Sequence, residues 1–65
     1  SDMILLKSTS QYGFLCIENK TPKGRQEPEQ KVFQFEVERH GGKYIIVRSI
    51  DEFMKAIDNY LNGEL

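Results

Sequence analysis

The sequence predicts a small single-domain α/β fold, and three observations support this prediction. Residues 3–7 and 14–17 are short apolar runs joined by six polar or small residues, which is typical of an antiparallel hairpin. Residues 43–47 have a strong propensity for a strand. Residues 50–61 carry apolar side chains at helical spacing. A chain of 65 residues allows one domain at most, so residues 1–65 are assigned to a single domain.

The two runs of the predicted hairpin also indicate where it lies in the sheet. Neither run alternates cleanly between apolar and polar residues, which is typical of strands that are covered on both faces. We therefore expect both strands to lie centrally in the sheet. Cys16 falls inside the second run, and we expect it to be a small, buried apolar side chain.

The segment that follows the loop at residues 19–31 allows two interpretations. The residues from Phe33 to Val37 alternate between apolar and polar, which is a strand period. Pro28, with acidic residues on both sides of it, suits the first turn of a helix, and Gly41 suits a helix C-terminus. The pattern alone leaves both interpretations open.

The last helix has the clearest boundaries in the chain. Ser49 and Glu52 have the spacing of a capping box, in which Ser49 caps the helix and Glu52 reaches back. The apolar positions continue to Leu61, and Gly63 follows. The sequence therefore predicts an amphipathic helix that begins after Ser49 and ends before Gly63.

Composition excludes several classes of function. Nine basic and ten acidic residues give a net charge of −1, which argues against a protein that binds nucleic acid through bulk positive charge alone. A single cysteine excludes an internal disulfide and a two-cysteine zinc site. No apolar run is long enough to span a membrane, and no signal peptide is visible, so we expect a cytoplasmic protein.

Three charged residues at the ends of the predicted hairpin suggest a site. In an antiparallel pair centred on Ser10, partner positions have a constant sum, so Asp2 lies opposite Glu18. Facing carboxylates repel, and a hard divalent cation such as Mg²⁺ would reverse that repulsion because it prefers oxygen ligands. Lys20 lies two residues beyond Glu18, on the same strand face. A cation, two acids and a lysine at one point would polarise a phosphodiester, but a carboxylate pair at the end of a hairpin is usually only solvated, and Glu-x-Lys occurs by chance in many sequences.

Longer stretches of the sequence resemble a known family. The stretches are IENKTPKGR at 17–25, PEQK at 28–31 and GKYIIVRS at 42–49. Together with Asp2 they resemble the VRR-NUC nuclease domain of the PD-(D/E)xK, or restriction-endonuclease-like, superfamily. The resemblance covers nearly the whole chain. It implies a mixed central sheet in the order strand–strand–helix–strand–helix, with residues 28–40 helical.

The resemblance also implies a function. It implies a Mg²⁺- or Mn²⁺-dependent endonuclease that cleaves branched or flapped DNA in repair or phage recombination. Small members of the family resemble Holliday-junction resolvases and act as homodimers, and a symmetric junction needs the two cuts that a twofold dimer supplies. A bacterial or phage-encoded intracellular protein is implied.

The resemblance assigns roles to individual residues. Asp2 and Glu18 match the two acids, and Lys20 matches the motif lysine. Asn19 would offer its backbone carbonyl to the metal, and Gln30 would lie beside the site at the start of the helix. The resemblance also implies that the basic residues after the site contact DNA phosphates. These residues are Lys23, Arg25 and Lys31.

The sequence departs from the family at three places. Ser1 stands where proline is usual, and Glu27 stands where serine is usual. The family's N-terminal helix and strand, which precede the position of Asp2, are missing. Because the chain begins at Ser1 and not at Met, we expect part of a longer protein or the remnant of a cleaved tag. The missing elements motivate one alternative, a non-catalytic DNA-binding remnant of the nuclease fold. A further alternative is a protein-interaction module that uses the last helix.

Overall fold

The computed structural model describes residues 2–65, and Ser1, with the expectation attached to it, lies outside the described residues. Three strands and two helices follow one another in the order strand–strand–helix–strand–helix, as predicted. Their bounds are β1 (Met3–Leu5), β2 (Phe14–Asn19), α1 (Pro28–Arg39), β3 (Gly42–Val47) and α2 (Ile50–Leu61). The protein is therefore a small α/β fold.

The three strands form one mixed sheet in the order β1-β2-β3. The strands β1 and β2 are antiparallel, with Met3 opposite Ile17 and Leu5 opposite Leu15. This is the predicted register, in which the partner numbers sum to twenty. The strands β2 and β3 are parallel, so a crossover through α1 connects them. The carboxyl ends of β2 and β3 consequently lie at the same edge of the sheet.

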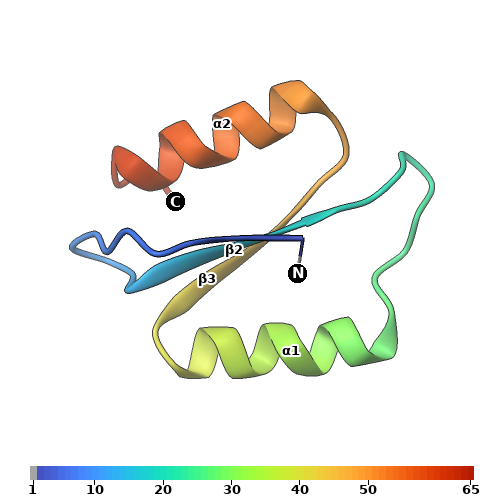
Figure 1. Ribbon diagram of the computed structural model, residues 1–65, viewed down its shortest axis with the longest axis horizontal. Helices are drawn as coiled ribbons and strands as arrows, with labels where there is room; N and C mark the ends of the chain where they lie inside the picture. Colours follow the sequence, from blue (N-terminus) through green and yellow to red (C-terminus); the bar gives the residue numbers. More distant parts are fainter. Residues whose placement is uncertain (1) are drawn as a thin grey trace.

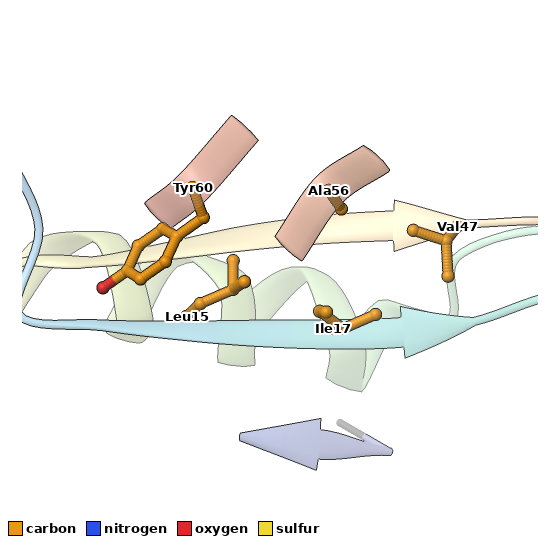
Figure 2. Close-up of a cluster of buried hydrophobic side chains, with 5 residues drawn as sticks. All are labelled: Leu15, Ile17, Val47, Ala56 and Tyr60. Carbon is orange, nitrogen blue, oxygen red and sulfur yellow. The ribbon is translucent and has the colours of Figure 1, made fainter. Parts of the chain in front are cut away.

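The two helices cover opposite faces of the sheet (Figure 1). On one face, residues of β2 and β3 pack against Ala56 and Tyr60 of α2, and Figure 2 shows this cluster. The Tyr60 hydroxyl also donates a 2.6 Å hydrogen bond to the Lys7 carbonyl, which ties α2 to the hairpin connection. On the other face, Val37 of α1 packs on Cys16 and Tyr44. The sheet is thus the middle of three layers.

The ends of both helices follow from local sequence. At α1, Gln30 Oε1 accepts from the Glu27 backbone N–H at 2.8 Å in a capping box, and Pro28 occupies the first turn. Gly41 follows the C-cap residue with φ +88°, a conformation that favours glycine. At α2, Ser49 Oγ accepts from the Glu52 N–H, but the Glu52 carboxylate accepts from the Arg48 N–H and not from Ser49. The predicted N-cap at Ser49 is confirmed. The bond that Glu52 makes back toward the start of the helix goes to Arg48, one residue before the predicted partner.

The strand-like alternation inside α1 has a physical explanation. Only Val37 of this helix is buried, while Phe35 remains 64% exposed and Phe33 lies at the edge of the contact. A helix with so narrow a buried face does not need apolar residues at helical spacing. The spacing of apolar residues alone therefore could not identify α1 as a helix.

The prediction that both hairpin strands lie centrally is wrong for the first one. In the described sheet β1 is an edge strand, and its Ile4 side chain is 51% exposed because α1 packs on β2 and β3. The strand β2 is central, with four consecutive buried residues, as predicted. Cys16 is buried, also as predicted. Neither of the two described helices is long and apolar enough to cross a membrane.

Candidate metal and nucleic-acid site

The predicted site residues gather at the edge of the sheet where β2 and β3 end. Both helices begin at this edge, because each follows a strand that runs toward it (Figure 1). Helix N-termini carry partial positive charge, and ligands of open α/β sheets bind beyond the carboxyl ends of the strands. The topology therefore brings together the end of β2, the loop after it and the start of α2.

Asp2 is held against the end of β2 by two hydrogen bonds. Its backbone N–H donates to the Ile17 carbonyl at 3.0 Å, and its Oδ2 accepts from the Asn19 N–H at 2.7 Å. These two partner residues, Ile17 and Asn19, precede and follow Glu18 on β2, so Asp2 lies against the part of β2 that carries Glu18. Asp2 itself is exposed and lies one residue beyond the β1–β2 ladder. Its carboxylate therefore faces both solvent and the strand end.

Glu18 has a different environment, because it is 6% exposed. It is the one charged residue among the buried residues of the described chain. It lies on β2 two residues after Cys16, and so shares the face of the sheet that α1 covers. A buried carboxylate requires partners or a cation to offset the loss of hydration.

Tyr44 lies close to Glu18 on the neighbouring strand. Burial raises the pKa of the Tyr44 hydroxyl, the Gln26 amide opposes this shift, and the negative charge of Glu18 adds to it. The side chains of Glu18 and Gln26 thus lie near the hydroxyl. The sequence did not single out Tyr44, because this proximity depends on the register of β2 against β3.

Lys20 follows directly after β2. Its backbone N–H donates to the Val47 carbonyl at 2.9 Å, so its backbone stays beside the end of β3. Lys20 lines an open hollow of about 380 Å³, together with residues from the ends of both strands and the start of α2, which are Asn19, Arg48, Ser49, Ile50 and Phe53. The prediction that its side chain shares the face of Glu18 stays a prediction, because the hollow that Lys20 lines opens toward α2, whereas Glu18 lies on the face that α1 covers. Within residues 2–65, Lys20 forms no ion pair. Its ammonium is therefore available to an anion.

Arg48 organises the loop between β2 and α1. Its Nη1 donates to the Thr21 carbonyl at 2.9 Å and to the Gly24 carbonyl at 2.6 Å. The loop also contains a turn in which the Gly24 N–H donates to the Thr21 carbonyl at 3.0 Å. Lys23 and Arg25 lie on either side of Gly24 and are exposed. Arg48 therefore fixes the loop that presents these two cations.

Three other predicted site residues, Gln30, Asn19 and Lys31, also lie at this edge. The side-chain oxygen of Gln30, Oε1, accepts the capping-box hydrogen bond of α1. The side-chain NH₂ group of Gln30 is left for other partners. The Asn19 N–H is used by Asp2, and the Asn19 side chain lines the hollow. Lys31, in the first turn of α1, is exposed. Gln30 and Lys31 therefore lie at the helix N-terminus that faces this edge.

The oxygen donors at this edge are of the type that Mg²⁺ and Mn²⁺ prefer. They are the carboxylates of Asp2 and Glu18 and the backbone carbonyl of Asn19. In the described part of the chain, no group of three or more His, Cys, Asp or Glu residues surrounds a common point. Two carboxylates supplemented by water are sufficient for Mg²⁺, so the residues present fit this ion.

Comparisons with known proteins give no further guide: no family model, no curated protein and no solved structure matches this chain.

Removing the Arg48 side chain is expected to lower the free energy of unfolding. Arg48→Ala deletes both bonds to the loop carbonyls, and hydrogen bonds of this kind contribute about 1 kcal/mol each, so we expect a loss of about 1–2 kcal/mol. Urea denaturation measures it. The matched control is Arg39→Ala on α1, where the exposed pair with Glu36 contributes less than about 0.5 kcal/mol. Equal losses in the two variants would contradict the role of Arg48.

Proposed function

We propose that this chain is the metal-binding core of a Mg²⁺- or Mn²⁺-dependent endonuclease that hydrolyses phosphodiester bonds in branched or flapped DNA. The observation that carries the proposal is the pair of carboxylates at the end of β2. Asp2 is fixed there by the Asn19 N–H, and Glu18 lies between the two residues that hold it. A restriction-endonuclease-like fold of the VRR-NUC type is part of the proposal, and the element order and mixed sheet support it.

The chemistry follows from the residues at this edge. A divalent cation, when bound, neutralises phosphate charge and activates water for hydrolysis. Asp2 and Glu18 would hold that cation, and the hydrogen bond from the Asn19 N–H fixes the orientation of the Asp2 carboxylate. Lys20 directs its ammonium at the phosphate, where negative charge increases during the reaction.

The basic residues around the carboxylates bind the DNA backbone. Lys23 and Arg25 are presented on the loop that Arg48 fixes, and Lys31 lies at the start of α1. Contacts from an exposed loop to phosphates position DNA without reading its sequence. This suits an enzyme that selects DNA by its branched structure.

A homodimer is part of the proposal, because a symmetric junction needs two cuts. Two features support it: the outer edge of β1, which has no partner strand among residues 2–65, and an apolar groove of about 340 Å³ between β1, β2 and α1. The groove is lined by Ile4, Phe14, Cys16, Phe33, Glu36, Val37 and His40. Action on intracellular DNA would place the protein in the cytoplasm of a bacterium, including one infected by a phage that encodes it.

Calorimetric titration with Mn²⁺ tests the metal site. We expect one ion per chain, and Asp2→Asn should weaken the affinity at least about tenfold because it removes a charged oxygen ligand. The control is Asp58→Asn, an exposed acid on α2, which should bind as the unchanged protein does. No binding by the unchanged protein, or equal binding by Asp2→Asn, would overturn the proposal.

Replacing both Lys23 and Arg25 by alanine should weaken DNA binding equally for all sequences. Because two phosphate contacts are lost, the slope of log K against log salt concentration should fall by about 2. The control removes two exposed cations elsewhere, with Lys7→Ala and Lys55→Ala, and should keep the slope. Affinity for branched DNA, measured at several salt concentrations, gives the slope for the variant and for the control. A changed sequence preference would show that the loop reads bases.

A second candidate function is DNA binding without cleavage. The observation that favours it is the composition of the hollow, which is lined by Lys20, Arg48 and the start of α2 but not by Asp2 or Glu18. Such a surface binds phosphate without a metal. Affinity for branched DNA that is the same in Mg²⁺ and in a chelator, with no cleavage in either, would support this candidate.

A further inference from the structure

Tyr44 carries a buried hydroxyl group for which the described residues provide no hydrogen bond. The side chain is 4% exposed and stands on β3, on the face that α1 covers. The hydroxyl oxygen is shielded from solvent and has no partner of acceptable geometry among residues 2–65. A buried hydroxyl without a partner is costly, so its presence next to a candidate site calls for a partner that forms when the site is in use.

Glu18 is the acceptor that the fold places next to this hydroxyl. Cys16 pairs with Tyr44 in the parallel ladder, and Glu18 lies two residues further along β2, on the same face. The charge of Glu18 acts on the hydroxyl, so the two groups are close. The other polar neighbour, Gln26, lowers the pKa of the hydroxyl, and its Nε2 donates to Gln34 Oε1 at 2.9 Å. A phenol needs an acceptor, and Glu18 supplies one.

We propose that Tyr44 is a positioning residue for Glu18. When a divalent cation is bound, the Tyr44 hydroxyl donates to one oxygen of the Glu18 carboxylate and leaves the other oxygen for the cation. This inference rests on the proposed function, since it assigns Glu18 to the cation. Donors that orient a metal-binding carboxylate raise metal affinity, and losing one weakens it about 10–100-fold. For a single hydroxyl we expect the lower end of that range.

Calorimetry with Mn²⁺ on Tyr44→Phe is the first test. We expect the affinity to fall about tenfold. The melting temperature in a chelator should not fall, because the lost hydroxyl has no partner in the described residues without metal. Tyr60→Phe is the matched control. It removes another buried hydroxyl, on the opposite face, which donates to the Lys7 carbonyl. It should lower the melting temperature and leave the affinity for Mn²⁺ unchanged.

A second measurement uses the unchanged protein, so it does not depend on the folding of a variant. The chain contains three tyrosines, which are Tyr12, Tyr44 and Tyr60. Carbon-13 labelling at Cζ gives three resonances, and Tyr12→Phe and Tyr60→Phe assign them. On addition of Mg²⁺ the Tyr44 resonance should shift, because its hydroxyl gains an acceptor, while the other two should not.

The outcomes separate this inference from the proposed function. If the unchanged protein binds no Mn²⁺, the proposed function itself fails. If it binds Mn²⁺ but Tyr44→Phe binds within twofold of it, the metal site stands and the positioning role of Tyr44 is overturned. If Tyr44→Phe does not fold, the Tyr44 resonance decides: a shift with Mg²⁺ supports the role and a constant position overturns it.

Discussion

Glu18→Gln is expected to lower the rate of cleavage of branched DNA by about a thousandfold, comparable to the loss of a preorganised catalytic group. The amide keeps the size of the side chain but removes the charge that holds the cation. Glu18 is almost fully buried, so neither solvent nor a neighbouring exposed acid can replace it there. Single-turnover cleavage of a labelled four-way junction in Mg²⁺ measures the rate.

The control for this prediction is Glu64→Gln, which removes the same charge from an exposed position near the C-terminus. It should cleave at the rate of the unchanged protein. Affinity for the junction in a chelator should be the same in all three proteins, because Glu18 acts through the cation. A rate for Glu18→Gln within tenfold of the unchanged protein would remove Glu18 from the metal site.

Lys20→Ala is expected to separate an enzyme from a DNA-binding module. Lys20 lines the hollow and forms no ion pair in the described chain, and we propose that its ammonium meets the phosphate at the scissile bond. An interaction made mainly in the transition state affects turnover more than binding. We expect affinity for branched DNA within about threefold, which is under 1 kcal/mol. We expect cleavage to slow at least about a hundredfold.

Binding and single-turnover rates measured on the same junction give both quantities for Lys20→Ala. Lys55→Ala, on the exposed surface of α2, is the control and should change neither. If affinity and rate fall in the same proportion, Lys20 is an ordinary phosphate contact. That result would favour DNA binding without cleavage.

The parts of the fold that depend on neighbouring residues could be predicted from the sequence. Ser49 defines the start of α2 because its side chain accepts from the Glu52 N–H, a bond that lies within four residues. The register of the hairpin also follows from the position of its turn, and it brings Asp2 to the end of β2, where Asp2 accepts from the Asn19 N–H. The edge position of β1 could not be predicted in this way. It results from the packing of α1 on β2 and β3, and the apolar residues around Ile4 do not reveal that packing.

The parts of the site that depend on distant residues could not be predicted. Arg48 reaches carbonyls 24 and 27 residues earlier in the chain, and no spacing rule relates them. Tyr44 meets Glu18 only through the parallel register of β2 and β3. Gln30 could be placed at the start of α1, but its use in the capping box depends on the backbone at Glu27.

Cleavage of a labelled four-way DNA junction by the unchanged protein, with and without a divalent cation, tests the central claim most directly. The carboxylates at the end of β2 predict cleavage in Mg²⁺ or Mn²⁺, its loss in a chelator, and little cleavage of linear duplex of the same sequence. No cleavage of any branched substrate with either ion, or equal cleavage in the chelator, would contradict a metal-dependent nuclease built on Asp2 and Glu18.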